Sequence, residues 1–177
     1  MKKATFLDRD GVINKRAPDG GYILRWQDFQ ILPGVATAIS LLNQAGFHVV
    51  VVTNQQCISK DLLSPAVLEE IHKGMTNELA ASGAHLDSIY FCPHGKDQSC
   101  ACRKPAPGML LTAAKEHEID LTSSWMIGDT ETDIAAGRSA GCKTIQIIHN
   151  PTEVAASGAD FTAESLLAAV KKILPAA

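Results

Sequence analysis

Five short apolar runs, each followed by a segment of helical character, constrain the fold of this chain more than any other feature. The runs are bounded by glycine or polar residues, which is typical of buried strands. Strands that alternate with helices build a mostly parallel sheet with helices on both faces. The predicted strands are Ala4–Leu7, Phe47–Val52, Ser88–Phe91, Trp125–Ile127 and Thr144–Ile148.

Helix-boundary residues mark the segments between and after these runs. Pro33-Gly34 opens one helix, and Ser64-Pro65 supplies an N-cap and a first-turn proline for another. We expect a doubly wound, five-stranded α/β sheet in the order 5-4-1-2-3, with residues 1–177 forming a single domain. The expected helices cover about 33–44, 65–83, 107–118, 131–140 and 163–174, and a loop covers 151–159.

Charge and hydropathy limit the partners. A formal charge of −3 is too small to favour nucleic acid or an anionic membrane surface. No apolar run approaches the roughly 18 residues of a membrane span, and the apolar stretch near the N-terminus is too short for a signal peptide. We therefore expect a cytoplasmic protein that binds neither nucleic acid nor membrane, and we expect it to be a monomer.

Two carboxylates follow the first predicted strand directly. Asp8 and Asp10 are separated by one residue and are followed by Gly11. In a parallel sheet, ligands bind beyond the carboxyl ends of the strands. One carboxylate there can attack phosphorus and bind a metal while the other transfers protons. A solvated turn, which Asp-Gly also favours, is the alternative for this motif alone.

A second acidic group follows the fourth predicted strand. Asp129 and Asp133 lie where the helix expected over 131–140 begins. Helix capping is the alternative for this segment, but it does not explain acidic residues at the end of a second strand. Strands one and four are neighbours in the expected order, so Asp8, Asp10 and Asp129 should converge. Three close carboxylates repel one another unless a hard cation such as Mg²⁺ lies between them.

Groups suited to holding phosphate appear at the same predicted edge. The second strand ends in Thr53, Asn54 and Gln55, which offer a hydroxyl and two amides. Arg103 and Lys104 precede the helix expected over 107–118. A lysine can neutralise a transferring phosphoryl group, and an arginine can bind phosphate through two hydrogen bonds. A solvated basic pair is the alternative for the two cations.

Four soft ligands lie close together just before these cations. They are Cys92, His94, Cys100 and Cys102, and they include three of the five cysteines of the chain. Three thiolates and one imidazole suit a closed, tetrahedral zinc site of the structural kind. Buried free thiols beside a surface histidine are the alternative.

Taken in order, these motifs resemble those of the haloacid dehalogenase superfamily of phosphatases. The strings FLDRDGVIN, VVVVTNQ, FCPHG…CACRKPAPGML and MIGDTETDIAAGRSAGCKT are similar to the branch that contains heptose-bisphosphate and histidinol-phosphate phosphatases, and the similarity spans residues 4–148. It implies a Mg²⁺-dependent phosphatase with a phosphoaspartyl intermediate, acting on a small phosphorylated sugar. The 7-phosphate of D-glycero-D-manno-heptose 1,7-bisphosphate, used in surface-glycan synthesis, is the first expectation, and histidinol phosphate is the alternative.

The resemblance also implies roles. Asp8 would be the nucleophile and Asp10 the general acid and base. Mg²⁺ would be held by the Asp8 and Asp129 carboxylates and the Asp10 backbone carbonyl, and Thr53 and Lys104 would bind the transferring phosphoryl group. The remaining implied contacts are with phosphate and substrate through Asn54, Gln55 and Arg103, and with zinc through Cys92, His94, Cys100 and Cys102.

The intervals between the motifs are too short for a large cap domain, so loops over residues 15–28, 54–62 and 92–106 should shape the site. The chain departs from the branch at residues 56–61, where glycines are missing, and at Thr130, where the branch often has a basic residue.

Two alternatives of another class are a phospho-accepting receiver domain and a non-catalytic zinc-binding module.

Overall fold

A parallel sheet forms the centre of the protein. The computed structural model describes residues 1–150, 152, 155–156 and 158–174. Within them six strands follow one another in the order β3-β2-β1-β4-β5-β6, all pairs parallel. The strands are β1 (Ala4–Leu7), β2 (His48–Asn54), β3 (Ser88–Cys92), β4 (Trp125–Gly128), β5 (Lys143–Ile147) and β6 (Phe161–Ala163).

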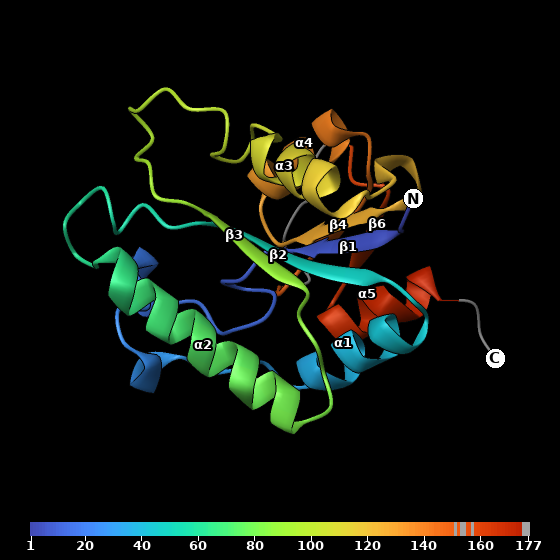
Figure 1. Ribbon diagram of the computed structural model, residues 1–177, viewed down its shortest axis with the longest axis horizontal. Helices are drawn as coiled ribbons and strands as arrows, with labels where there is room; N and C mark the ends of the chain where they lie inside the picture. Colours follow the sequence, from blue (N-terminus) through green and yellow to red (C-terminus); the bar gives the residue numbers. More distant parts are fainter. Residues whose placement is uncertain (151, 153–154, 157, 175–177) are drawn as a thin grey trace.

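Helices cover both faces of this sheet (Figure 1). On one face lie α3 (Gly108–His117) and α4 (Glu131–Ala140), and on the other α1 (Val35–Gln44) packs beside α5 (Leu166–Ile173). The long helix α2 (Pro65–Ala81) buries its apolar side chains in the same core as α1 and α5. The predicted α/β architecture is confirmed.

The β2 strand shows why both faces must be covered. Val49 and Val51 pack with α1, α2 and α5, whereas Val50 and Val52 pack with α3 on the opposite face. All four side chains are fully buried. Because successive side chains of a strand point to opposite faces, a continuous apolar run requires an apolar partner on each side.

The prediction of five strands was wrong. A sixth strand, β6, pairs with β5 at the edge of the sheet, and α5 begins at Leu166 rather than at Ala163. The strand is only three residues long and two of them are exposed, so it has no apolar run of its own. The Ser165 hydroxyl accepts a hydrogen bond from the Ala168 amide and so sets the start of α5. Part of the loop expected over 151–159 lies outside the described residues.

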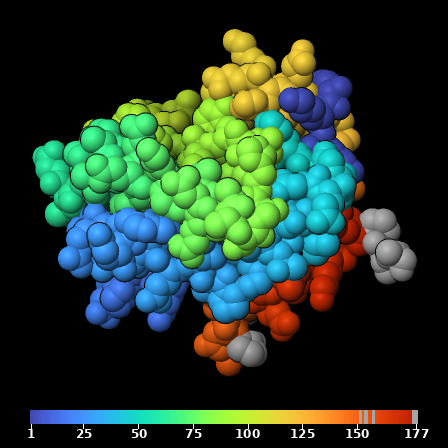
Figure 2. Space-filling view, turned by 60° about the horizontal axis from the view of Figure 1, so that its bottom comes forward, coloured from blue at the N-terminus to red at the C-terminus, as the bar shows by residue number. Residues whose placement is uncertain are grey.

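Short loops replace a large cap among the described residues. The connection after β1 holds two 3-10 turns, Pro18–Gly20 and Trp26–Asp28, and its Trp26 ring packs against α2 at Gly74. Figure 2 shows this connection, in blue, beside α2, in green, on the surface of the protein. A Cβ atom at position 74 would lie 2.5 Å from the Trp26 ring, so glycine is required for this contact.

Among the described helices, none has both the length and the apolar character that crossing a membrane would require.

Gly137 sets the distance between α4 and the sheet, and we predict that Gly137→Ala destabilises the fold. The added Cβ would lie 2.6 Å from Met126 Cβ and 2.9 Å from Thr144 Cγ2. Overpacking of this kind costs about 1–3 kcal/mol, more than the roughly 0.5–1 kcal/mol that alanine gains in a helix. Denaturant unfolding should therefore give a lower free energy of unfolding, whereas Ser139→Ala, on the exposed side of α4, should change it little. An unchanged value for Gly137→Ala would contradict the close packing.

Candidate active site

A cleft of about 250 Å³ lies at the carboxyl edge of the sheet. Its walls come from residues 8–10, 16–17 and 20–23 after β1, from 53–55 at the end of β2, from Lys104 and from 130, 132 and 133 at the start of α4. The Asp8 amide donates a 2.9 Å hydrogen bond to the Ile127 carbonyl, which ties the end of β1 to β4. Parts of the three segments expected to shape the site, 15–28, 54–62 and 92–106, therefore line it.

Lys104 links the two acidic motifs. Its ammonium lies 2.7 Å from Asp8 Oδ1 and 2.6 Å from Asp133 Oδ1, and it donates a 2.8 Å hydrogen bond to the Val52 carbonyl. The lysine side chain is 2% exposed. Burial alone disfavours the ammonium, but Asp133 and Asp8 outweigh it and hold the pKa of Lys104 above its usual value. The lysine is therefore charged beside Asp8.

Asp133 makes contacts that the sequence motif did not predict. Its Oδ2 accepts hydrogen bonds from the Thr130 amide at 3.0 Å and the Thr130 hydroxyl at 2.6 Å, which completes a capping box at the start of α4. Its Oδ1 binds Lys104. The same carboxylate thus caps α4 and holds Lys104. Helix capping, the alternative raised for this segment, therefore occurs together with a contact at the site.

Asp129 lies beside Asp8 and carries its own cation. Arg16 Nη2 is 2.7 Å from Asp129 Oδ1, and His149 Nε2 is 3.5 Å from Asp129 Oδ2. Gly11, with φ of +97°, passes so close that a Cβ atom there would overlap Asp129 Oδ2. Glycine is required here both for its left-handed backbone and for this approach. Arg16 was not identified from the sequence, since nothing in its neighbourhood marks it.

Negative charge is concentrated at this edge. Ligand oxygens of Asp8, Asp129 and Asp133 lie within 4.8 Å of one another. Burial raises the pKa of Asp8 to about 7, with Lys104 opposing the rise and the neighbouring carboxylates adding to it. Burial also raises the pKa of Asp129 despite Arg16. A hard divalent cation would stabilise both charged forms. Asp8 and Asp129, whose pKa values are both raised, are the pair whose charged forms such a cation would stabilise, whereas both oxygens of Asp133 are taken up by Lys104 and Thr130.

Asp10 is held as a carboxylate by three neighbours. Arg9 Nη2 lies 3.0 Å from Oδ1 and 2.9 Å from Oδ2, the Asn14 amide donates to Oδ1 at 2.9 Å, and the Gln55 amide donates to Oδ2 at 3.0 Å. Burial would raise the pKa of Asp10, but Arg9 and the amide donors outweigh it and hold this pKa below its usual range. The arrangement favours the carboxylate form of Asp10 in the free protein. Neither Arg9 nor Asn14 was singled out from the sequence.

The polar residues at the end of β2 line the cleft and hydrogen-bond to its charged groups. The Asn54 side chain donates to the Lys104 carbonyl and accepts from the Lys104 amide, both at 3.1 Å. The Gln55 amide bridges Asp10 and the Thr53 hydroxyl, which lies 2.8 Å away. Asn54 and Gln55 thus orient Lys104 and Asp10, while Thr53 is buried in the wall of the cleft.

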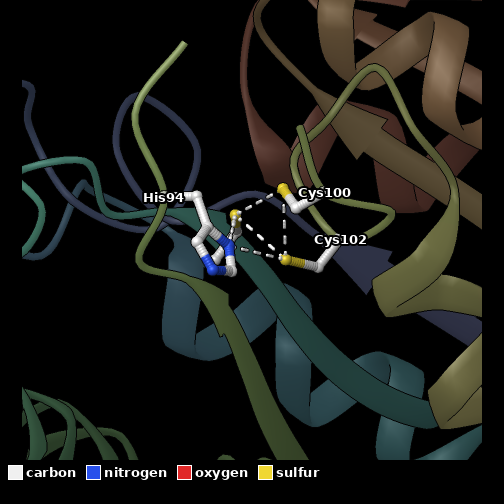
Figure 3. A group of neighbouring side chains, drawn as sticks. His94, Cys100 and Cys102 are labelled. Atoms are coloured by element: carbon white, nitrogen blue, oxygen red, sulfur yellow. Dashed lines mark hydrogen bonds between the residues drawn. The ribbon is translucent and has the colours of Figure 1, made fainter. Parts of the chain in front are cut away.

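The four soft ligands come together next to the cleft. His94, Cys100 and Cys102 point toward one another in Figure 3. The sulfur of Cys92 lies 3.1 Å from that of Cys102 and 3.8 Å from that of Cys100, and His94 Nδ1 lies 3.5 Å and 3.3 Å from the sulfurs of Cys92 and Cys102. Zinc–sulfur bonds of about 2.3 Å would place ligand atoms about 3.8 Å apart around a tetrahedral ion. The spacing and the donor set therefore fit zinc.

Arg103 joins this cluster to the loop that carries Lys104. Its guanidinium donates a 2.9 Å hydrogen bond to the His94 carbonyl, so it lies against the cysteine-rich loop. Arg103 borders a second hollow, which it shares with Lys104 and Thr130. The predicted substrate contact of Arg103 would come from this side.

Comparisons with known proteins agree with this geometry. A family model of HAD-hydrolase-like proteins matches residues 101–169. The D-glycero-beta-D-manno-heptose-1,7-bisphosphate 7-phosphatase of Pasteurella multocida is 39% identical over 175 residues, covering 94% of this chain and 94% of that protein. The enzyme of the same name from Helicobacter pylori is 40% identical over 151 residues, covering 84% and 86%.

A solved structure shows the same fold. The crystal structure of D,D-heptose 1,7-bisphosphate phosphatase from B. bronchiseptica, complexed with magnesium and phosphate, superposes with a TM-score of 0.87 at 34% identity, covering 97% of both chains. The fold and the acidic cleft thus define a phosphatase of the haloacid dehalogenase type. Within that class, the chain belongs to the family of the D-glycero-D-manno-heptose-1,7-bisphosphate 7-phosphatases.

This relationship confirms the predicted enzyme class, a phosphoric monoester hydrolase acting on a small phosphorylated sugar. The receiver domain and the non-catalytic zinc module are excluded as descriptions of the chain.

We predict that purified protein carries about one zinc per chain and that Cys100→Ser loses it. Burial raises the pKa of the Cys92 thiol to about 12, so a cation is needed to ionise it at neutral pH. Without the ion, the loop should loosen and Lys104 should contact the phosphoryl group less often. Elemental analysis should show the loss, and kinetics should show a higher KM and a lower kcat. Ser99→Ala, at the exposed neighbouring position, is the matched control. Parent kinetics in a zinc-free variant would show that the cluster does not position the lysine.

Proposed function

We propose that this chain removes the 7-phosphate of D-glycero-β-D-manno-heptose 1,7-bisphosphate through a phosphoaspartyl intermediate on Asp8. The observation that carries the chemistry is the buried ion pair of Asp8 with Lys104, which lies in the cleft at the end of β1. The substrate assignment rests on relatives with this activity in their names that match nearly the whole chain. Those of P. multocida and H. pylori are named for the β anomer, which supports that anomer here.

The proposed cofactor at the cleft is Mg²⁺, held by the Asp8 and Asp129 carboxylates and the Asp10 backbone carbonyl. Support comes from the raised pKa values of Asp8 and Asp129 and from the magnesium in the similar B. bronchiseptica structure. When bound, the ion would neutralise the phosphoryl oxygens and the nearby carboxylates. Arg16 would have to share or release Asp129, since its guanidinium now lies against the same carboxylate.

The proposed reaction proceeds in two displacements. A carboxylate oxygen of Asp8 attacks phosphorus, the bond to the sugar oxygen breaks, and Asp10 gives a proton to that oxygen. Asp10 must first take up this proton when substrate binds, because Arg9 and the amide donors favour its carboxylate form in the free protein. Asp10, now a carboxylate, takes a proton from a water that attacks the phosphoaspartate. Phosphate leaves, Asp8 is restored, and Asp10 has regained the proton for the next cycle. Lys104 and Thr53 would bind the phosphoryl oxygens during both steps.

The remaining predicted site residues enter the proposal with adjusted roles. Because Asn54 and Gln55 hydrogen-bond to Lys104 and Asp10, we propose that they position these groups. Arg103 would contact the substrate beyond the reacting phosphate. Zinc at Cys92, His94, Cys100 and Cys102 would be structural, holding the loop that carries Arg103 and Lys104.

Several expectations from the sequence belong to this proposal and stay predictions. We propose that residues 1–177 act as a single domain with the zinc loop 92–102 within it. The two apolar cores, which lie on opposite faces of one sheet, support this description. The monomeric state, the cytoplasmic location and the lack of nucleic-acid and membrane partners also stay predictions.

Removing the nucleophile or the cation should abolish turnover. We expect Asp8→Asn to lower kcat by roughly 10³-fold or more, because the attacking group is lost. Chelation of divalent cations should stop the parent enzyme, and added Mg²⁺ should restore it. Rapid quenching followed by mass spectrometry should detect phosphate on Asp8 in the parent only. Asp97→Asn, an exposed carboxylate outside the cleft, is the control. Near-normal turnover by Asp8→Asn would mean that water attacks phosphorus directly.

Substrate comparison separates the proposed sugar from its rival. We expect the β anomer of the heptose bisphosphate to give the highest kcat/KM, exceeding the α anomer and histidinol phosphate by about tenfold or more, a usual ratio for closely similar ligands. Steady-state phosphate release with the three compounds measures this. A preference for histidinol phosphate would transfer the assignment to the other activity of the branch while leaving the mechanism unchanged.

A further inference from the structure

We propose that His72 is a positioning residue for the reaction, acting through Arg9 to fix the Asp10 carboxylate. This inference rests on the proposed function, since it concerns the group that takes a proton from water in the second step. Neither residue was assigned a role from the sequence, and they lie 63 positions apart.

Arg9 is an unusual residue to find in the interior. It is 1% exposed and is among the largest fully buried side chains of the described residues. A buried guanidinium is costly unless its charge is paired and its N–H groups are hydrogen-bonded. The Arg9 Nη2 group contacts both oxygens of Asp10, at 3.0 and 2.9 Å, so the pair is held through one end of the guanidinium.

His72 holds the other end. Arg9 Nη1 lies 3.2 Å from His72 Nε2, and a guanidinium nitrogen can only donate. The Nε2 atom must therefore accept, which fixes His72 as the neutral tautomer with its proton on Nδ1. Burial, together with the neighbouring Arg9, lowers the pKa of His72 to about 3, in agreement with this form.

Packing leaves the guanidinium few other positions. The Phe29 ring centroid lies 5.7 Å from its carbon, and His72 is held by α2 with its ring 6.2 Å from that of Phe91. With Nη1 bound to His72, rotation of the guanidinium would break the hydrogen bond, so Nη2 stays directed at Asp10. Together with the amides of Asn14 and Gln55, the α2 helix thereby helps to fix where the carboxylate lies, although it contributes no residue to the walls of the cleft.

The consequence can be measured separately in the second displacement, in which Asp10 takes a proton from water. Asp10 must direct one oxygen at the attacking water, and small changes of its orientation weaken proton transfer. If His72 no longer accepts from Arg9, the guanidinium can turn and take Asp10 with it. Hydrolysis of the phosphoaspartate should slow, while binding of the substrate should change little because His72 does not line the cleft.

The test compares His72→Leu, which removes the acceptor, with His72→Gln, whose amide oxygen can accept from Arg9. The probe is p-nitrophenyl phosphate, whose leaving group departs without a proton, so that formation of the phosphoaspartate does not depend on Asp10. Acid quenching during turnover measures the fraction of enzyme that carries phosphate. We expect His72→Leu to accumulate phosphoenzyme and to lose about tenfold or more in kcat. This loss is part of the roughly 10²–10⁴-fold contribution typical of general acid–base catalysis. The concentration of Mg²⁺ that the enzyme requires should not change. His72→Gln should restore both to near the parent values.

Other outcomes would overturn the inference. If His72→Leu hydrolyses phosphoaspartate at the parent rate, or if Leu and Gln variants are impaired equally, His72 has only a structural role. His72→Met, another flexible apolar replacement, takes the place of His72→Leu if that variant does not fold. If the parent itself forms no phosphoaspartate, the proposed function fails first. If the parent forms phosphoaspartate and the His72 variants hydrolyse it at the parent rate, only this inference is refuted and the proposed function stands.

Discussion

The rest of the site depends on one buried ion pair network, in which the Lys104 ammonium lies between Asp8 and Asp133. Moving a charge out of water costs several kcal/mol unless partners compensate it. Here two carboxylates and the Val52 carbonyl surround the ammonium at 2.6–2.8 Å. The network joins the end of β1, the end of β2 and the start of α4. It therefore ties the carboxyl ends of two paired strands, β1 and β2, to the start of α4.

Two independent devices hold Lys104 in that network. Asn54, at the end of β2, makes two hydrogen bonds to the lysine backbone. The cluster that ends at Cys102 restrains the same segment from the other side, and Arg103 adds a hydrogen bond to the His94 carbonyl. The cleft can therefore stay ordered although loops form most of its walls. A volume of about 250 Å³ suits a small substrate better than a polymer.

The loop over residues 56–61, where the sequence departs from the expected motif, packs beside the site rather than in its wall. Asp61 has φ of +54°, a left-handed conformation that aspartate tolerates better than most residues. Cys57 is fully buried, and Lys60 lies 5.3 Å from the centre of the Tyr22 ring, which borders the cleft. The loop without its glycines thus contacts the wall of the site through the connection after β1.

The sequence by itself determined the features that depend on neighbouring residues. Apolar runs predicted five of the six strands. Acidic residues directly after β1 and β4 indicated the reactive edge, because ligands bind at the carboxyl ends of parallel strands. The soft ligands lie within a short segment, so the sequence could suggest a zinc site there. The sequence did not predict the three-residue β6, because this strand is defined by its pairing with β5 and not by an apolar run.

Only the tertiary structure decided which polar groups face each other. Asn54 and Gln55, whose predicted contacts with phosphate and substrate stay predictions, line the cleft and hydrogen-bond to Lys104 and Asp10. Arg9 and His72, far apart in the sequence, are neighbours because α2 packs against the sheet. A polar side chain can satisfy its hydrogen bonds with many partners, and the choice is made by distant elements that bury it. Local patterns therefore located the active site, whereas long-range packing decided how its groups are held.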